Sequence, residues 1–455
     1  MSEQVWSPVL SEDQGPQYRA IVTALERDLA EGRIRPGVRL PARRSLAETL
    51  GVSLGTVTRA YEEMERRGLV RGQVGRGTFV ISPTTGIAQA NDGSVTDLGI
   101  NISPDVGEEP LLRDALRRLA KSDALADCMA YLPHLGLDQH RHAVMNGLVR
   151  WRGHAFKPAE IALTNGAQHS ISLVVDLFAQ QPGGLLSEGL TYTGVLALAR
   201  HRGLPLRGVA IDEDGMRPDS LAAAARETGA RLVHLTPNLQ SPTATVMSEA
   251  RRHEIVAVAR ELDLYLLEDD VYGFLCAGGP SPLQSLAPER TFYVSSFAKC
   301  LFPGVRLGMV VFPGQFAAHI ARGLRTTSWM ASPMLAALLA SMSEERVVDE
   351  IVARKRVEAK RRTALARKIL GERVQGHDHS FHLWMPLPDH QAALTLVGQA
   401  AANGIVLTAP EAVQVAPDAP SGVRLCLGTN SIESLDGALQ QLDRLNWQIA
   451  SRSIV

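Results

Sequence analysis

The sequence predicts an α/β protein made of two unlike parts, a small helical unit and a larger body with a mostly parallel sheet. The chain of 455 residues is too long for one ordinary hydrophobic core, so two or three folding units are expected. From Leu98 onward, apolar runs such as EIALTN, ARLVHLTPN and TFYVSS alternate with helical ones, which is typical of a sheet covered by helices. Residues 17–80 hold twelve arginines against seven acids, a local charge of +5, while the whole chain has a net charge of −1.

The composition disfavours several classes of protein. A net charge of −1 gives no whole-chain argument for a nucleic-acid or membrane partner, so any such argument has to be local. The four cysteines are scattered without a C-x-x-C pair, which fits a reducing compartment and predicts neither a disulfide framework nor a metal site. No signal-peptide pattern is visible, and the apolar runs are shorter than the roughly 18 residues that a membrane span needs. We therefore expect a cytoplasmic protein.

The first unit, residues 17–80, has the order helix, turn, helix and hairpin. The run SLAETL has helical spacing and ends at Gly51, and Ser53 can cap a second helix from about Leu54 to Arg67. Apolar residues of that helix recur at three- and four-residue spacing and are expected to face the core, namely Val57, Ala60, Tyr61 and Met64. The following run GLVRGQVGRGTFV predicts two short strands around a glycine-rich tip.

This order predicts a winged helix-turn-helix that binds double-stranded DNA, because the second helix presents its first turns outward. Arginines beside the helices and at the hairpin tip are candidate phosphate contacts. The candidate DNA-binding residues are Arg43, Arg44, Ser53, Gly55, Thr56, Thr58, Arg59 and Arg76. The alternative is an arbitrary helical hairpin with a solvated arginine face, which the complete order and the excess of arginine disfavour.

The same stretch resembles the winged-helix domain of GntR-type bacterial regulators. The family pattern L-P-S-x-R-x-L-A, L-x-V-S-R-x-T-V and G-x-G-T-F-V lines up with LPARRSLA, LGVSLGTV and GRGTFV. Leu54 stands where the family commonly has an arginine that contacts DNA, so that contact is not carried over. We expect residues 1–80 to form a DNA-binding domain, residues 81–97 a linker rich in Ser, Thr, Gly and Asn, and residues 98–455 a second domain.

Lys299 is the candidate reactive residue of the second domain. It follows a strand-like run in SSFAK (residues 295–299) and is one of only six lysines among 47 basic residues. A lysine that binds pyridoxal 5′-phosphate must be partly desolvated, so that its amine is often neutral. Asp269, at the end of the strand-like run LYLLED, is suited to keep the ring nitrogen protonated, and Tyr272 is suited to bond the ring hydroxyl.

Residues suited to a phosphate accompany this lysine. Ser296 and Arg306 flank it and supply a hydroxyl and a guanidinium. The run TNGAQ (residues 164–168) opens a helical stretch, so a phosphate is expected on the amides of Gly166 and Ala167 at the helix N-terminus. Each signal alone has an ordinary interpretation, because single lysines and Glu-Asp-Asp runs usually lie at the solvated surface. Their combination in this order predicts a cofactor site.

From Leu98 to Leu445 the chain resembles the fold-type-I aminotransferases. The family motif S-x-S-K-x-x-x-P-G-x-R-x-G matches SSFAKCLFPGVRLG, with Ala298 in place of the second serine. The resemblance implies that Lys299 forms the internal aldimine with pyridoxal phosphate. It also implies Asp269 and Tyr272 as ring partners, and Gly166, Ala167, Gln168, Ser296 and Arg306 as phosphate partners.

The resemblance assigns three more residues and shows one departure. Tyr192 matches the aromatic that stacks on the ring, and Arg424 matches the arginine that clamps a substrate α-carboxylate. Tyr131 matches a tyrosine that reaches the phosphate of the neighbouring subunit, which implies a homodimer. The family's N-P-T-G loop, whose asparagine bonds the ring hydroxyl, is SPTA here; Ser241 takes the asparagine position, and nearby Asn238 is a candidate substitute.

A winged helix joined to an aminotransferase-like body is similar to the MocR subgroup of GntR-type regulators. The resemblance implies transcription regulation, in which an amino acid, an amine or a B6 vitamer changes the cofactor site and so alters binding to a DNA operator. The alternative is a working aminotransferase that acts on an amino acid. Leu54 slightly favours this alternative, and Ser241 speaks against it.

Overall fold

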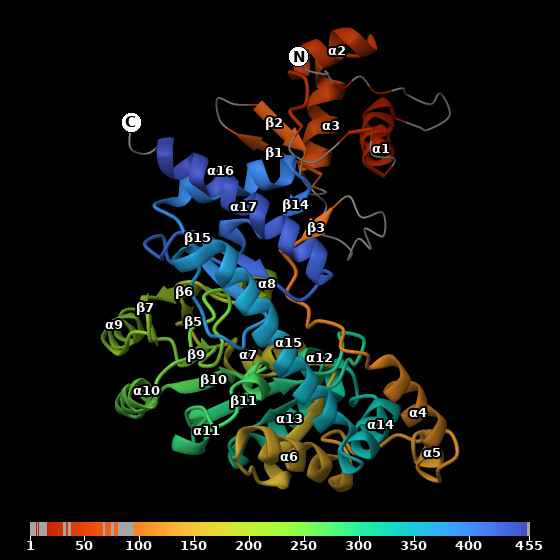
Figure 1. Cartoon of the computed structure of the whole chain (residues 1–455), viewed down its shortest axis with the longest axis vertical. Helices are drawn as coiled ribbons and strands as arrows, with labels where there is room; N and C mark the ends of the chain where they lie inside the picture. The colour runs from red at the N-terminus through yellow and green to blue at the C-terminus, as the bar shows by residue number, and fades with distance from the viewer. Residues whose placement is uncertain are drawn as a thin grey trace. The chain divides into compact units, whose positions relative to one another are not determined.

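The computed structural model describes residues 6, 8, 16–30, 33–34, 38–66, 69–73, 77–80 and 95–452. The chain divides into two compact units, one of residues 1–95 and 398–404 and the other of residues 96–397 and 405–455. Figure 1 follows the chain by colour from the N-terminal unit in red to the C-terminal helices in blue. Within the described ranges, no helix combines the length and the apolar composition that a membrane crossing needs.

The N-terminal unit contains the predicted helices and hairpin: α1 (Gln17–Ala30), α2 (Arg43–Leu50), α3 (Leu54–Arg66), β1 (Val70–Gln73) and β2 (Gly77–Val80). Gly51 ends α2 in the left-handed conformation with φ 62°, which glycine adopts without strain. The amide of Thr56 donates to Ser53 Oγ at 3.1 Å, which confirms the predicted cap of α3. The four apolar residues of α3 that were predicted to face the core are all buried: Val57, Ala60, Tyr61 and Met64.

The two predicted strands of this unit pair antiparallel, with Val70 opposite Val80. The glycine-rich tip between them, residues 74–76, lies outside the described residues, and so do residues 81–94 of the predicted linker. The predicted phosphate contact of Arg76 therefore stays a prediction from the sequence.

A seven-stranded sheet with the order β4-β12-β11-β10-β9-β5-β6 forms the centre of the larger unit. The strands are β4 (Ile161–Thr164), β5 (Leu185–Glu188), β6 (Leu206–Val209), β9 (Leu232–Leu235), β10 (Tyr265–Asp269), β11 (Thr291–Ser296) and β12 (Gly308–Val311). β12 pairs antiparallel with β4 and β11, and the other neighbours in this sheet pair parallel. The prediction of a mostly parallel sheet is confirmed.

Both faces of the sheet are covered, because side chains alternate along each strand. In β12, Met309 belongs to a core cluster with α6 and α14, whereas Val310 belongs to a cluster with α7 and α13. In β10, Leu266 packs in a third cluster with α9, α10 and α11, and Leu267 faces the α7 side. Figure 1 shows α9, α10 and α11 together along the green part of the sheet. Because the strands are buried on both faces, they are nearly continuous apolar runs, and this explains why the strands could be predicted from the sequence.

The helices of the larger unit are α4 (Glu109–Leu119), α5 (Ala124–Asp127), α6 (Asp138–Arg152), α7 (Ala167–Phe178), α8 (Thr193–Arg202), α9 (Pro218–Thr228), α10 (Glu249–Glu261), α11 (Leu283–Leu286), α12 (Phe297–Cys300), α13 (Ala317–Thr327), α14 (Pro333–Glu344), α15 (Val347–Leu370), α16 (His390–Ala402), whose last residues from 398 onward are grouped with the other unit, and α17 (Ile432–Arg452). Short strands complete it. β13 (His382–Pro386) pairs with β15 (Gly422–Cys426), β3 (Thr96–Asp97) pairs with β14 (Ile405–Val406), and β7 (Ile211–Asp212) pairs with β8 (Gly215–Met216).

Candidate functional site

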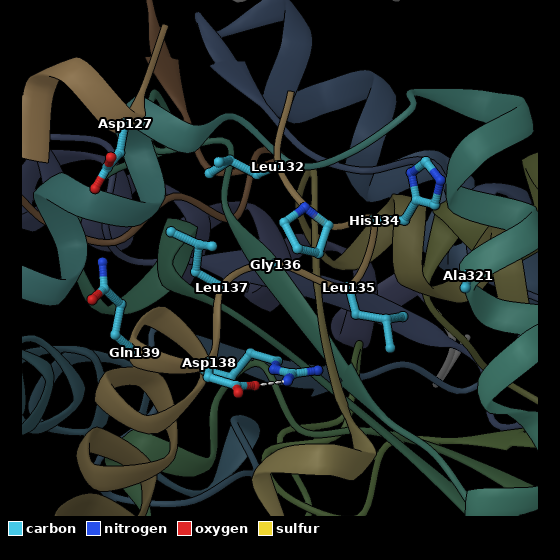
Figure 2. A pocket seen from close by; sticks show the side chains of 11 residues that line it. Asp127, Leu132, His134, Leu135, Gly136, Leu137, Asp138, Gln139 and Ala321 are labelled. Atoms are coloured by element: carbon cyan, nitrogen blue, oxygen red, sulfur yellow. Dashed lines mark hydrogen bonds and ion pairs between the residues drawn. The ribbon is translucent and has the colours of Figure 1, made fainter. Parts of the chain in front are cut away.

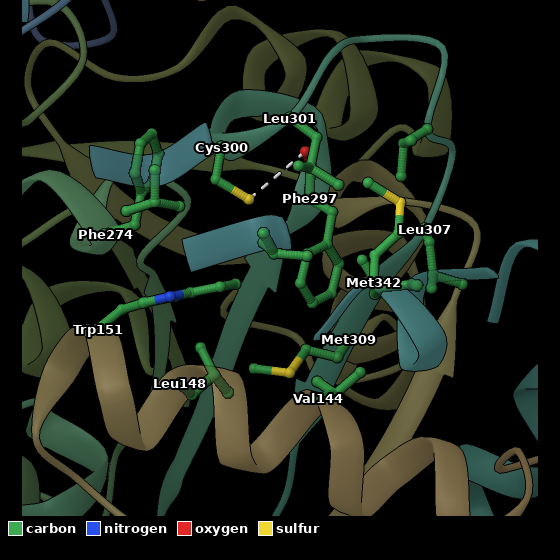
Figure 3. Close-up of a cluster of buried hydrophobic side chains, with 14 of the residues drawn as sticks. Val144, Leu148, Trp151, Phe274, Phe297, Cys300, Leu301, Leu307, Met309 and Met342 are labelled. Atoms are coloured by element: carbon green, nitrogen blue, oxygen red, sulfur yellow. Dashed lines mark hydrogen bonds between the residues drawn. The ribbon is translucent and has the colours of Figure 1, made fainter. Parts of the chain in front are cut away.

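The predicted lysine lies directly after a central strand, on the one-turn helix α12 that follows β11. The side chain of Ser296 starts this turn by accepting a hydrogen bond from the amide of Ala298 at 3.2 Å, and it donates to the carbonyl of Leu307 at 3.3 Å. Figure 3 shows Phe297 and Cys300, on either side of the lysine in sequence, inside the large apolar cluster above α6. The core therefore fixes the backbone of α12 and leaves Lys299 to face the pocket.

Lys299 is partly buried, and its amine has no carboxylate partner among the described residues. Nζ donates a hydrogen bond to the backbone oxygen of Asn101 and lies 5.7 Å from the centre of the Tyr272 ring. Burial, helped by the guanidinium of Arg424, lowers the pKa of Lys299 from 10.5 to about 8. A substantial fraction of this amine is therefore neutral near physiological pH, as a lysine that attacks an aldehyde requires.

Asp269 is the last residue of β10 and is buried at the same edge of the sheet. Its Oδ2 lies 3.8 Å from His234 Nε2, and its Oδ1 accepts a longer hydrogen bond from the amide of Val271 at 3.4 Å. Nε2 of His234 is buried without a hydrogen-bond partner in the described part of the chain. Tyr192 is the N-terminal cap of α8, and burial together with the negative charge of Asp269 raises the pKa of its hydroxyl.

Tyr272 is buried, and burial raises the pKa of its hydroxyl. The hydroxyl oxygen accepts a hydrogen bond from Asn101 Nδ2 at 2.7 Å. The same amide nitrogen lies 2.9 Å from Nδ1 of His382, and the other nitrogen of this histidine lies 2.9 Å from the carbonyl oxygen of Gln240. Sequence reasoning identified Tyr272 but not Asn101 or His382.

Gly166 and Arg306 meet at the N-terminus of α7. Gly166 has φ 90° and begins this twelve-residue helix as its N-terminal cap. Its φ favours glycine, and a Cβ added to Gly166 would lie 2.8 Å from Arg306 Nη2, so a larger residue would strain the turn and displace the guanidinium. Arg306 is exposed, and no hydrogen bond or ion pair joins it to the described residues. Helix amides and a guanidinium in one place suit an anion.

Arg424, in β15, is buried and is held from three sides. Nη1 donates to Ser241 Oγ at 3.0 Å, and Nη2 donates to the carbonyl of Gly99 at 2.8 Å and to Thr408 Oγ1 at 3.2 Å. Its Nε is buried without a hydrogen-bond partner in the described part of the chain. Ser241 thus contacts the guanidinium that the sequence assigned to a carboxylate.

Two of the other candidates have contacts that constrain their roles. Asn238 donates to Asp270 at 2.6 Å and accepts from Arg252 at 2.7 Å, so both ends of its amide are engaged in this buried network. Gln168 donates from Nε2 to the carbonyl of Gly194 at 3.1 Å, and its buried Oε1 has no hydrogen-bond partner among the residues that the structure describes. The predicted substitution of Asn238 for the missing loop asparagine gains no support from these contacts and stays a prediction.

Tyr131 lies outside this pocket, with 82% of its surface exposed and its ring centre 5.6 Å from that of Trp329. Next to it is a hollow of about 610 Å³ lined mainly by residues 132–139 (Figure 2). Figure 2 shows Leu132, Leu137 and Leu135 around this space, and none of the residues of the lysine pocket lines it.

On the N-terminal unit, several of the predicted DNA-binding residues surround the start of α3. Ser53 and Gly55 are exposed, while Ser53 Oγ and Thr56 Oγ1 lie 2.9 Å apart, so the hydroxyl of Thr56 is engaged at the helix cap. Arg59 stacks over the ring of Tyr18 with its guanidinium carbon 4.3 Å from the ring centre.

The two arginines at the start of α2 differ in their contacts. Both are exposed, but the guanidinium carbon of Arg43 lies 5.6 Å from the ring centre of Tyr61. Thr58 is half-buried. Solvent exposure of the helix start is compatible with the predicted interface, and the individual DNA contacts stay predictions.

Comparison with known proteins shows which families the two parts of the chain match. Residues 93–442 match the model of aminotransferase class I and II proteins. The chain belongs to this family. Residues 17–80 match the model of gntR family bacterial regulatory proteins. The chain is therefore a GntR-type DNA-binding regulator with an aminotransferase-like domain, which confirms the predicted architecture.

Relatives with names of transcriptional regulators match between about two thirds and nearly all of the chain. The HTH-type transcriptional regulator YdeF of Bacillus subtilis is 25% identical over 97% of this chain and 96% of its own. The HTH-type pyridoxine biosynthesis transcriptional regulator PdxR of Corynebacterium glutamicum is 30% identical over 65% of this chain and 66% of its own. The probable rhizopine catabolism regulatory protein MocR of Rhizobium meliloti is 25% identical over 84% and 82%, respectively.

Solved aminotransferase structures share the fold of the larger unit. A kynurenine aminotransferase of Pyrococcus horikoshii superposes with a TM-score of 0.72 at 20% identity, covering 78% of this chain and 91% of its own. The α-aminoadipate aminotransferase LysN of Thermus thermophilus, solved with a phosphopyridoxyl-leucine compound, gives a TM-score of 0.68 at 20% identity over 79% and 93%. The predicted fold-type-I aminotransferase fold is confirmed.

Proposed function

We propose that this regulator binds pyridoxal phosphate at Lys299 and uses the bound cofactor to sense a small amino compound. The observation that carries the proposal is the amine of the partly buried Lys299, which has no carboxylate partner among the described residues and has a lowered pKa. When bound, the cofactor supplies an aldehyde for this amine and an electron-withdrawing ring. Asp269 would hold the proton on the ring nitrogen, and Tyr192 would cover one face of the ring.

Residues near the lysine also fit the phosphate group of the cofactor. The space that a Cβ would fill at Gly166 lets Arg306 lie against the N-terminus of α7, where a phosphate gains both the guanidinium and the helix amides. The amide of Ala167 belongs to this first turn, and Gln168 presents a buried oxygen without a partner beside it. In the proposal, Ser296 fixes the turn that carries Lys299.

Arg424 would recognise the carboxylate of the effector. A guanidinium binds a carboxylate through charge-assisted hydrogen bonds. Nε of Arg424 has no partner among the described residues, and a carboxylate would take over hydrogen bonds that the terminal nitrogens now donate to Ser241 and Thr408. Ser241 stands where the family has an asparagine that bonds the ring hydroxyl. The serine side chain is shorter, and its Oγ already accepts a hydrogen bond from Arg424. This favours ligand sensing over efficient transamination as the role of the pocket.

A homodimer that binds a DNA operator completes the proposal. The exposed Tyr131 and the adjacent hollow are suited to a second copy of the chain, in which Tyr131 would contact the neighbouring site. Two copies of the helix-turn-helix would read two half-sites of the operator, as paired helix-turn-helix units do. Analytical ultracentrifugation tests this part, because a monomer at micromolar concentration would contradict it.

The cofactor proposal is tested by borohydride reduction of the purified protein mixed with pyridoxal phosphate. Wild type is expected to retain one pyridoxyl group after denaturation, located at Lys299 by peptide mass spectrometry. Lys299→Ala should lose this label, while the exposed-lysine control Lys360→Ala should keep it. A label that survives at full yield in Lys299→Ala would show that another amine holds the cofactor.

A further inference from the structure

Asn101 connects three parts of the lysine pocket. Its backbone oxygen accepts from Lys299 Nζ, and its side-chain nitrogen contacts both Tyr272 Oη and His382 Nδ1. Asn101, Tyr272 and His382 are buried and come from segments far apart in the sequence. The side-chain oxygen of Asn101 is buried without a hydrogen-bond partner in the described part of the chain. Asn101 therefore contacts the candidate lysine, the candidate partner of the ring hydroxyl and a buried histidine at the same time.

The direction of each hydrogen bond follows from one fixed acceptor. The carbonyl oxygen of Gln240 can only accept, so Nε2 of His382 carries a proton. Burial lowers the pKa of His382 to about 3, so the ring is neutral and Nδ1 is an acceptor. Asn101 must therefore turn its amide nitrogen toward His382. The second proton of that nitrogen goes to Tyr272 Oη, which leaves the tyrosine's own proton free to donate into the pocket.

We propose that Asn101 is a positioning residue for pyridoxal phosphate, which fixes Tyr272 as the hydrogen-bond donor to the ring hydroxyl. This inference rests on the proposed function. A hydroxyl that accepts a hydrogen bond becomes a stronger donor, because hydrogen bonds in a chain polarise one another. Asn101 thereby offsets part of the donor capacity lost at Ser241, whose hydroxyl faces Arg424 instead.

The same chain of contacts links the ring to the effector side of the pocket. Gln240 bonds His382 through its backbone and directly precedes Ser241, which contacts Arg424. Arg424 also donates to the carbonyl of Gly99, two residues before Asn101. A carboxylate that takes up hydrogen bonds of Arg424 therefore acts on both segments that orient Asn101.

The test is a pH titration of the visible absorbance of the cofactor-loaded full chain, together with the dissociation constant for pyridoxal phosphate. A weaker donor at Tyr272 raises the proton affinity of the bound chromophore, so the titration midpoint should move upward in Asn101→Ala by about 0.7 pH unit. The near-isosteric Asn101→Asp should move it at least as far, because a carboxylate accepts from Tyr272 instead of donating. Asp269, Arg306 and Arg424, the charged groups facing Lys299, are unchanged in these variants.

Ser103→Ala is the matched control. Ser103 is a buried polar residue of the same segment, and its hydroxyl contacts Lys355 and the carbonyl of Leu301 rather than the ring pocket. It should leave the midpoint unchanged. His382→Ala acts through Asn101, so its upward shift should be present in wild type and absent in the Asn101→Ala background.

The outcomes separate the two proposals. A wild-type protein that forms no reducible adduct with pyridoxal phosphate overturns the proposed function. A wild-type protein that forms it, with folded Asn101→Ala and Asn101→Asp variants titrating at the wild-type midpoint, overturns the role of Asn101 alone. Circular dichroism and thermal melting of each variant identify loss of fold, and Asn101→Asp keeps the test open if the alanine variant does not fold.

Discussion

At the scale of single residues, the buried Lys355 and the partly buried Lys299 differ in the groups that contact their amines. Lys355 is paired with the carboxylate of Glu108 and also donates to the carbonyl of Pro104. In the part of the chain that the structure describes, the hydrogen-bond partner of Lys299 is a neutral backbone oxygen, and burial together with the charge of Arg424 lowers its pKa to about 8. Burial lowers the pKa of both amines, but at Lys355 the carboxylate of Glu108 opposes this effect, whereas at Lys299 the charge of Arg424 adds to it. This contrast separates a structural lysine from a reactive one.

The lowered pKa predicts the pH dependence of cofactor uptake. Only the neutral amine attacks an aldehyde, so the rate of uptake at Lys299 should rise through pH of about 8 and level off above it. A lysine with the ordinary pKa of 10.5 would give a rate that still rises above pH 9. Stopped-flow absorbance of the apoprotein with pyridoxal phosphate measures this profile. A rate that keeps increasing to pH 10 would contradict the assigned environment.

Arg424 predicts the chemistry of the effector. Arg424→Gln removes the charge and should weaken binding of α-amino acids to the cofactor-loaded protein by at least about tenfold, because charge-assisted hydrogen bonds contribute about 1.5–3 kcal/mol. Amines without a carboxylate should bind with unchanged affinity. The control is Arg202→Gln, which removes a surface ion pair with Asp176. Equal weakening of both ligand classes would mean that Arg424 acts by supporting the fold.

At the scale of elements, the turn between β4 and α7 is the part of the pocket with the strictest backbone requirement. Gly166 combines φ 90° with a guanidinium where a Cβ would lie, and the Cβ position of Gly308 in β12 is only 2.6 Å from the carbonyl carbon of Gly166. Two glycines thus let a strand, a helix N-terminus and Arg306 approach one another.

Replacing Gly166 by alanine should therefore weaken pyridoxal phosphate binding by at least about tenfold, since it displaces Arg306 and strains the helix start by about 1–2 kcal/mol. Gly153→Ala is the matched control, because Gly153 also has positive φ, 69°, but has no atom within 4 Å of its Cβ position. It should lower the thermal stability comparably and leave cofactor affinity unchanged. Fluorescence titration with pyridoxal phosphate distinguishes these results, and equal affinities for both variants would argue against the phosphate site.

The elements were largely predictable from the sequence, and the reasons are physical. Strands buried on both faces are continuous apolar runs, and the caps at Gly51 and Ser53 follow from local backbone chemistry. The matched motif around Lys299 likewise named the residues at the edge of the sheet. Contacts that depend on the packing of distant segments left no such local signal.

Asn101 and His382 show what was missed. They lie 281 positions apart, and neither belongs to a motif that was singled out, so only the folded chain reveals their hydrogen bond. The engagement of Asn238 with Asp270 and Arg252 was equally invisible, because it depends on a buried network between β10 and α10.

At the scale of the whole molecule, the proposed function requires that the cofactor site and the DNA-binding domain influence each other. Such coupling exists only if a ligand binds two states of the protein with different affinities, and it typically changes the second affinity by about 5- to 150-fold. Neither the DNA-binding domain nor the cofactor site alone provides this coupling. A GntR-type domain without the lysine pocket would bind DNA without sensing, and the pocket alone would have no output.

The most direct measurement is a fluorescence-anisotropy titration of the DNA upstream of the protein's own gene with full-length protein. It is made at one fixed salt concentration, with and without saturating pyridoxal phosphate. The account predicts a several-fold change in the DNA dissociation constant for wild type and for the Lys360→Ala control, and no change for Lys299→Ala. A wild-type protein that loads the cofactor at Lys299 and binds DNA with the same affinity in both states would contradict the central claim.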